Sequence, residues 1–294
     1  MTRRAGVLLV IGLAAVVAVA YGPQAPTVVE PKFSAQQCQA IAADFLGVRA
    51  EELTRDERCE GPSDRRPPRY AFWIPYGDTA PVREGQRLFG QVQVWVDGLS
   101  GEVVFAEHAP RRFEIGPQQL GQEEARRIAE GFLEAHWAHW HGARLQEAGS
   151  PMPLNQRSDF PTAPQQWFRW VVEEDGIRTG RAEVNLNLST GEDIYYVQRY
   201  YSAQGLAPPR LTKEQAISEA LGKLDSKRRQ KAQFEEAYLA TRWYKGDVGL
   251  SWQVRLRAPA PVPDTFPGEP WMQSCGFTLD AYTGELLSQT GPEL

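Results

Sequence analysis

Alternating apolar and polar residues mark three segments of the chain, and each segment runs into a similar turn. The apolar positions are Val92, Val94, Val96; Ala182, Val184, Leu186; and Cys275, Phe277, Leu279. A period of two is typical of a strand with one buried face. The turns are Asp97–Glu102, Asn187–Glu192 and Asp280–Glu285, whose starts are 90 and 93 residues apart. Asp or Asn opens each turn and Gly stands fifth, where positive φ is needed. The pattern predicts three β-hairpins.

A helix is predicted upstream of each hairpin. The expected N-cap residues are Ser34, Gly121 and Thr212, which are 87 and 91 residues apart. Gln or Glu follows each cap by three residues, and at Ser34 and Thr212 this makes a capping box. Small and apolar residues then recur every four positions, which places them on one helical face: Cys38, Ala42, Leu46; Ala125, Ala129, Leu133; Ala216, Ala220, Leu224.

These two repeating elements predict an α+β fold of three tandem repeats. Each repeat would be one helix packed on a small antiparallel sheet. Further strand-like segments are expected at residues 69–76, 88–96, 166–174, 181–188, 236–244 and 250–257. The predicted organisation is an N-terminal segment at 1–30, then repeats at 31–110, 111–203 and 204–294.

The repeated unit resembles the PepSY domain. The resemblance lies in a helix that opens Ser/Thr-x-x-Gln/Glu-Ala and in strands that end at Asp-x-x-Thr-Gly-Glu. The middle unit is the most similar, with its helix at 121–132 and strands at 170–197. The first unit departs from the pattern at Cys38, and the third departs through an insertion. PepSY domains occur in propeptides of secreted metalloproteases and in membrane-anchored bacterial proteins. The resemblance implies a binding or inhibitory module outside the cytoplasm, without catalytic residues.

The N-terminus predicts export. Arg3 and Arg4 precede an uncharged apolar run at 5–20, which ends in a possible Ala18-Val19-Ala20 cleavage site. The arginines would keep their end cytoplasmic and send the remainder across the membrane. Cleavage and retention as a membrane anchor both stay open. The protein is therefore expected to be extracytoplasmic, either secreted or anchored to the cell membrane by this segment.

Candidate chemistry is sparse. A net charge of −5 argues against a nucleic-acid partner. There is no HExxH, G-x-S-x-G or Gly-rich phosphate loop, so neither a catalytic residue nor a cofactor is predicted. The alternative is a metal-dependent hydrolase that uses His136, His139 and His141, because imidazole is a common ligand of zinc. A third hypothesis is a structural envelope spacer.

The cysteines leave two interpretations open. Cys38 and Cys59 lie in one unit and could form a disulfide in an exported protein. Cys38 also aligns with Ala125 and Ala216, which suggests a packed core position instead. Cys275 falls on the buried face of its strand and is expected to be a core thiol.

The proline-rich insertion at 258–270 is the candidate contact site, because long loops in small domains often carry function. Its prolines would restrict the chain and present Phe266 and Trp271 to a partner. The first hypothesis is accordingly a non-catalytic, exported protein-binding module that inhibits or stabilises a peptidase or a cell-wall hydrolase.

The export segment can be tested with a reporter fused after Pro26 that is active only outside the cytoplasm. We expect activity in intact cells, and we expect it to fall when Arg3 and Arg4 are replaced by Glu, because the positive charges that set the orientation are then removed. An expressed fusion without activity in intact cells would contradict both the signal-peptide and the anchor interpretation.

Overall fold

The computed structural model describes residues 29–57, 66–75, 91–108, 117–152, 164–244, 246–260 and 271–290. The predicted export segment, Cys59 and Phe266 lie outside these ranges. No helix within the described ranges is long and apolar enough to span a membrane.

The predicted helices are present with the predicted caps. They are α1 (Ala35–Leu46), α2 (Gln122–His136) and α3 (Lys213–Gly222). Ser34 and Thr212 form reciprocal capping boxes with Gln37 and Gln215. The structure adds a short helix α4 (Ser226–Lys231) and the 3₁₀ turns η1 (Ala50–Glu52) and η4 (Trp140–Gly142). No apolar pattern predicts α4, which is polar throughout and is fixed by the buried Arg228.

Twelve strands are present in the described residues. They are β1 (Thr54–Arg55), β2 (Arg69–Pro75), β3 (Gln91–Asp97), β4 (Val103–His108), β5 (Ala143–Ala148), β6 (Gln165–Glu174), β7 (Ile177–Asn187), β8 (Asp193–Tyr200), β9 (Gln233–Tyr244), β10 (Asp247–Pro259), β11 (Met272–Asp280) and β12 (Leu286–Thr290). Below, "main sheet" means β1–β8 and "C-terminal lobe" means α3, α4 and β9–β12.

The α+β class is confirmed, but the strands form one connected sheet where three small sheets were expected. Its hydrogen-bonded order is β1-β2-β3-β4-β8-β7-β9-β10-β11-β12, with β6 on β7 and β5 on β6. β4 pairs with β8 in antiparallel fashion, and β7 pairs with β9 in parallel fashion. The small sheets merge because an exposed edge strand has unpaired N–H and C=O groups, which the next edge satisfies. The domain boundaries stay predictions.

The three turns have the same hydrogen bonds. The N–H of Gly101, Gly191 and Gly284 donates to the carbonyl oxygen of the Asp or Asn that opens its turn, over 2.9, 2.8 and 2.9 Å. The side chain of that Asp or Asn accepts from the N–H two residues on, over 2.7, 2.9 and 2.9 Å. All three glycines have positive φ, at 75°, 79° and 76°. The predicted turn chemistry is therefore correct.

Each turn also holds the chain that leads into a helix. The N–H groups of Phe33, Leu120 and Leu211 donate to backbone oxygens of the three turns over 3.0 Å. Their side chains lie over the turn glycines, so that a Cβ on Gly191 would be 3.3 Å from Leu120 Cδ1. Turn and helix start are thus fixed to each other.

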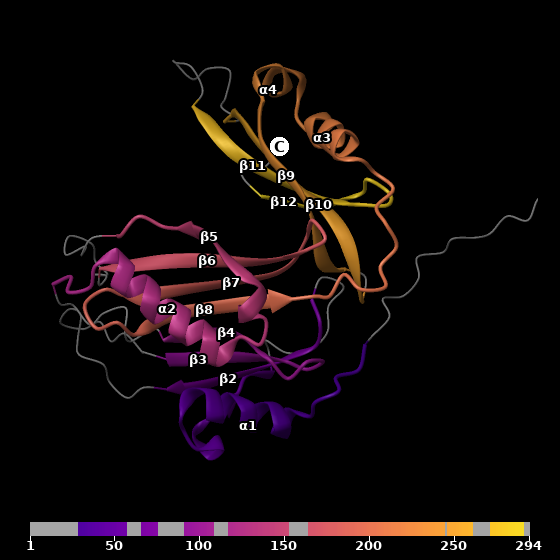
Figure 1. The fold of residues 1–294 in the computed structure, drawn as a ribbon. Coiled ribbons are helices and arrows are strands. Elements are labelled where there is room, and N and C mark those ends of the chain that lie inside the picture. The colour runs from indigo at the N-terminus through magenta and orange to yellow at the C-terminus, as the bar shows by residue number, and fades with distance from the viewer. Residues whose placement is uncertain are drawn as a thin grey trace, which may run out of the picture.

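Two apolar cores lie between helices and strands. α1 and α2 cover the same face of the main sheet, with Phe45 and Phe132 6.1 Å apart above the buried Tyr196 (Figure 1). The second core lies under α3 and contains Val254, Cys275 and Phe277. Val94, Val184 and Phe277 are all buried, as predicted for the alternating strands.

Gly191→Val should destabilise the full-length protein, because a β-branched residue at φ 79° is strained by about 1 kcal/mol or more. Gly191→Asn should cost less, because Asn visits the left-handed region. Gly131→Ala is the control, since Gly131 lies in α2 with open space around it and Ala is the better helix former there. Urea melts should show a loss for Val, a smaller loss for Asn and a gain for the control. Equal stability of all variants would contradict the described turn.

Candidate binding recess

The face of the main sheet opposite α1 and α2 carries aromatic and basic side chains. Trp95 of β3 stacks on Phe105 of β4, with ring centroids 4.3 Å apart. The guanidinium of Arg69 lies 3.8 Å above the Trp95 ring, and Tyr195 meets the edge of Phe105 at 5.4 Å. These positions alternate with the buried Val94, Val96 and Ala106, so they point away from the helices. We call this surface the outer face.

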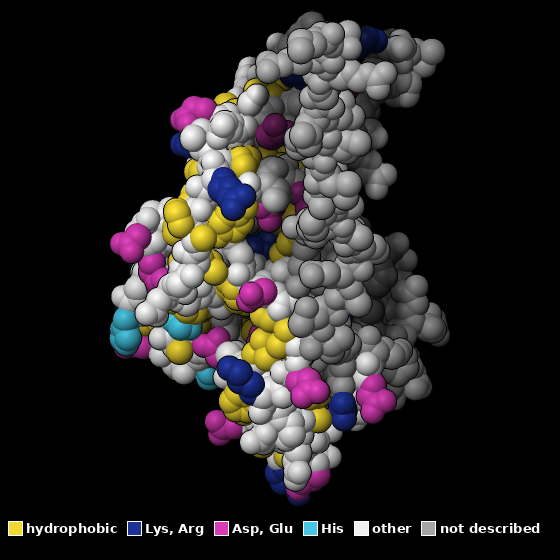
Figure 2. All heavy atoms as spheres, turned by 90° about the vertical axis from the view of Figure 1, so that its right-hand side faces the viewer, with side chains coloured by type: hydrophobic (Ala, Val, Ile, Leu, Met, Phe, Trp, Pro, Cys, Tyr) yellow, Lys and Arg dark blue, Asp and Glu magenta, His cyan; other side chains and the backbone are white. Residues whose placement is uncertain are grey.

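A cavity of about 720 Å³ opens on the outer face. The end of the β9–β10 hairpin supplies one wall through Trp243 and Val248, and the outer face supplies another. The remaining lining comes from the first turn and from segments before α1, before β2 and after β8. We call this cavity the recess. Hydrophobic side chains continue from the upper part of the molecule to its lower centre in Figure 2, with single basic and acidic side chains among them. The volume is in the range of about 300–1,000 Å³ that is usual for ligand sites.

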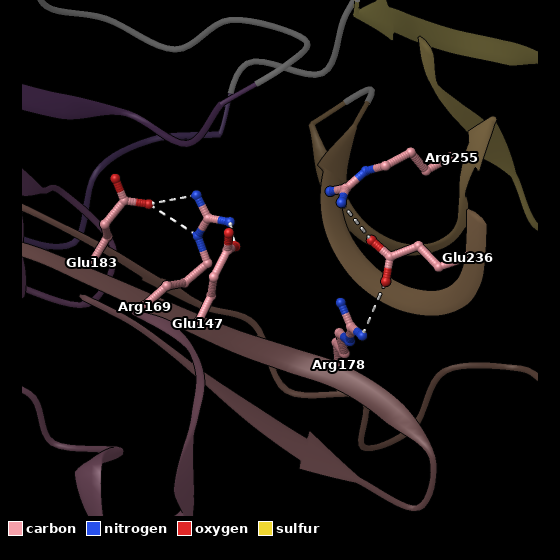
Figure 3. A network of polar contacts seen from close by, with 6 residues as sticks. All are labelled: Glu147, Arg169, Arg178, Glu183, Glu236 and Arg255. Atoms are coloured by element: carbon pink, nitrogen blue, oxygen red, sulfur yellow. Dashed lines mark hydrogen bonds and ion pairs between the residues drawn. The ribbon is translucent and has the colours of Figure 1, made fainter. Parts of the chain in front are cut away.

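The C-terminal lobe is held beside the outer face by a small junction. Ile177 and Arg178 of β7 pair with Leu239 and Ala240 of β9. The Arg178 guanidinium also lies 3.4 Å from the centroid of the Tyr238 ring. Glu236 of β9 forms ion pairs with Arg178, at 3.7 Å, and with Arg255 of β10, at 3.1 Å (Figure 3). Backbone pairing, an aromatic contact and a shared carboxylate therefore fix the wall of the recess.

Two arginines face each other on the outer face. Arg181 of β7 and Arg199 of β8 are direct cross-strand partners, and both line the recess. Both also line a smaller adjoining cavity of about 60 Å³. Among the described residues neither has a hydrogen bond or an ion pair, although the charge of Glu183 acts on Arg181. Like charges directly opposite each other destabilise a sheet, so this pair is unfavourable in the unbound protein.

Nearby carboxylates already have partners within the chain. Glu183 accepts from Arg169 Nε at 3.0 Å and from its Nη2 at 2.9 Å, and Glu147 accepts from Arg169 Nη1 at 3.0 Å (Figure 3). The Asp97 carboxylate accepts from the N–H groups of Leu99 and Ser100 within its turn. The positive charge of Arg181 and Arg199 is thus only weakly compensated.

The electrostatics of the recess reflect burial and crowding. Burial lowers the pKa of Arg181, and the charges of Arg199 and Arg169 lower it further. Burial raises the pKa of Tyr201 to about 12, with a smaller contribution from the Asp97 charge. Arg181 stays protonated because an arginine titrates far above neutral pH. The recess therefore presents a cation that is poorly solvated and would gain from an anionic partner.

Two indole groups add unused donors. Trp95 Nε1 and Trp243 Nε1 are buried, and neither has a hydrogen-bond partner in the part of the chain that the structure describes. Trp243 is 6% exposed. A buried donor without a partner costs free energy, so both indoles lower the stability of the unbound protein.

The three histidines of the hydrolase hypothesis do not converge. His136 packs on Phe45 and Phe132, with centroids 4.7 and 4.6 Å away. His139 stacks on Tyr200 at 3.5 Å, and its Nε2 lies 3.5 Å from Glu102. His141 is exposed in η4. Within the described ranges there is no group of three or more His, Cys, Asp or Glu that could hold a metal ion.

Only some of the other predicted site residues lie within the described ranges. Trp271 is 59% exposed at the end of the insertion, and Phe266 falls outside the described residues. Cys38 is buried on the α1 stripe, while the proposed disulfide to Cys59 falls outside the described residues. Cys275 is buried, and its sulfur lies 3.3 Å from Arg228 Nη2.

Sequence reasoning missed the recess, although one signal was available. The alternating strand 92–96 has Trp95 at a position where the pattern expects a polar residue. Large aromatic and basic residues on the open face of a half-buried strand point to a contact surface.

No protein-family model and no curated protein matches this chain. Two solved structures align with most of it. The Bacillus megaterium YpeB C-terminal domain aligns at 14% identity and a TM-score of 0.41, over 89% of this chain and 98% of that one. An uncharacterised protein from Eubacterium rectale aligns at 10% identity and a TM-score of 0.42, over 85% of this chain and 80% of that one. Neither is similar enough to carry a conclusion about function.

Arg181→Gln should stabilise the unbound protein by up to about 1 kcal/mol, because it removes the like-charge contact with Arg199. Arg181→Lys is the matched control, since it keeps the charge. Urea melts at low ionic strength should show the gain for Gln and not for Lys. The gain should shrink at high ionic strength, where salt screens the repulsion. A loss of stability in Arg181→Gln that Arg181→Lys does not share would mean that the charge is compensated in the unbound protein.

Proposed function

We propose that this chain is an exported, non-catalytic protein-binding module built from three PepSY-like units. The recurring turn, with its positive-φ glycine and its bond to the chain before each helix, supports the repeat. The same motif carries the resemblance to PepSY domains in the sequence. Export rests on the arginine-flanked apolar run at the N-terminus.

The observation that carries the binding function is the recess. Its walls combine Trp95, Phe105 and Trp243 with several arginines. Trp, Tyr and Arg are the residues most enriched where protein partners bind tightly. The fit is better for a macromolecular segment than for a small apolar compound, because charged and aromatic groups are spread along the walls.

The partner class follows from the PepSY resemblance, which implies a peptidase or a cell-wall hydrolase outside the cytoplasm. The module would inhibit or stabilise that enzyme by occupying a segment of it. No observation favours the histidine-based hydrolase, because the three imidazoles have separate aromatic or solvent environments.

A photo-crosslinking residue in place of Tyr201, inside the recess, should give a covalent adduct with one envelope protein in intact cells. The same residue in place of Phe234 is the control, since Phe234 is 49% exposed and does not line the recess. Mass spectrometry identifies the partner. Adducts of equal yield and identity from both positions, or none from position 201, would contradict a partner at the recess.

A further inference from the structure

The recess is more basic than the protein as a whole. Five basic side chains line it (Lys32, Arg66, Arg69, Arg181 and Arg199), against two acidic ones (Asp97 and Glu102). The whole chain has a net charge of −5. A positive concavity in an acidic protein attracts a local negative charge while the remaining surface repels an extended polyanion.

The two acidic side chains of the recess already have contacts within the chain, and five basic side chains outnumber them. Asp97 accepts the turn N–H groups of Leu99 and Ser100. Glu102 lies beside His139, at 3.5 Å. Arg181 and Arg199 consequently present adjacent guanidinium groups, whose fork geometry suits carboxylate oxygens.

The recess also has apolar walls, which a small anion would not contact. Trp95 and Phe105 form a stacked surface along the floor, and Trp243 closes the opposite side. A free phosphate would satisfy the arginines but would leave these rings without a contact. A peptide supplies carboxylates, apolar side chains and backbone carbonyl oxygens together.

From this geometry we propose that the recess binds an acidic, aromatic-containing segment of a partner polypeptide. This inference rests on the proposed function as a protein-binding module. A Glu or Asp side chain lies between Arg181 and Arg199, and an apolar side chain packs on Trp95 and Phe105. The acid removes the repulsion between the two arginines, so binding relieves a cost that the unbound protein carries.

Fluorescence anisotropy of a short labelled peptide of alternating Glu and Phe tests this directly, without the natural partner. We expect saturable binding that weakens at high salt. The same peptide with Gln in place of Glu should bind at least about tenfold more weakly, because hydrogen bonds to charged groups are lost. Equal binding of the two peptides would overturn the proposal.

Variants of the full-length protein test whether the peptide binds at Arg181 and Arg199. Arg181→Gln with Arg199→Gln should weaken binding of the Glu-Phe peptide by about tenfold or more. The control, Arg144→Gln with Arg257→Gln, removes the same charge from exposed positions outside the recess and should change binding little. A urea melt of each variant confirms folding. Equal losses in both double variants would mean that net charge alone attracts the peptide, which overturns the site.

Competition separates the ligand classes. Inorganic phosphate and a single-stranded oligonucleotide should each displace the peptide only at ionic strengths where sodium chloride does the same. Displacement by phosphate at lower ionic strength would make the recess an anion site and would overturn peptide recognition. If position 201 crosslinks a partner but the Glu-Phe peptide does not bind, acid recognition is wrong while the protein-binding function stands.

Discussion

The recess depends on two residues of parallel pairing between β7 and β9. Beyond Gly180, β7 extends past the end of β8, and Ile177 and Arg178 offer a free edge that β9 occupies. Around this short ladder, Arg178 stacks on Tyr238, and Leu239 packs with Leu250 and Ala281 in a small apolar cluster. Without this junction the outer face would be an open sheet, and Trp243 would not face Trp95 and Phe105 across a cavity.

Near this junction, some arginines form ion pairs with carboxylates and others do not. Arg169 engages Glu147 and Glu183, and Glu236 joins Arg178 to Arg255 across the junction. Arg181 lies on β7, the strand that also carries Arg178 and Glu183, and it opposes Arg199 of β8. Neither Arg181 nor Arg199 has such a partner in the described residues. Sites that bind ligands often keep such a stability cost, because the ligand removes it. The arrangement therefore links the stability of the unbound chain to what the recess binds.

The helices and turns were predictable because the signals for them are local. A capping box needs four residues, and the Asp-to-Gly turn needs five, so Ser34, Thr212 and Gly191 could be read without knowing what lies around them. The buried faces of β3, β7 and β11 were equally accessible through the period of two. The helix α4 was not, because its only buried side chain, Arg228, is held by the carbonyl of Pro259 at 2.9 Å, 31 residues away.

The sequence by itself determined three helix starts, three hairpin turns and which side of β3, β7 and β11 is apolar, since these follow from patterns within a few residues. It did not determine that the strands join into one sheet, because every unpaired edge offers the same N–H and C=O groups and the sequence does not say which edges meet. Only the tertiary structure brought Trp95, Arg181, Arg199 and Trp243 around one cavity. These residues come from four strands of three predicted units, and their shared environment is created by packing between elements far apart in the chain.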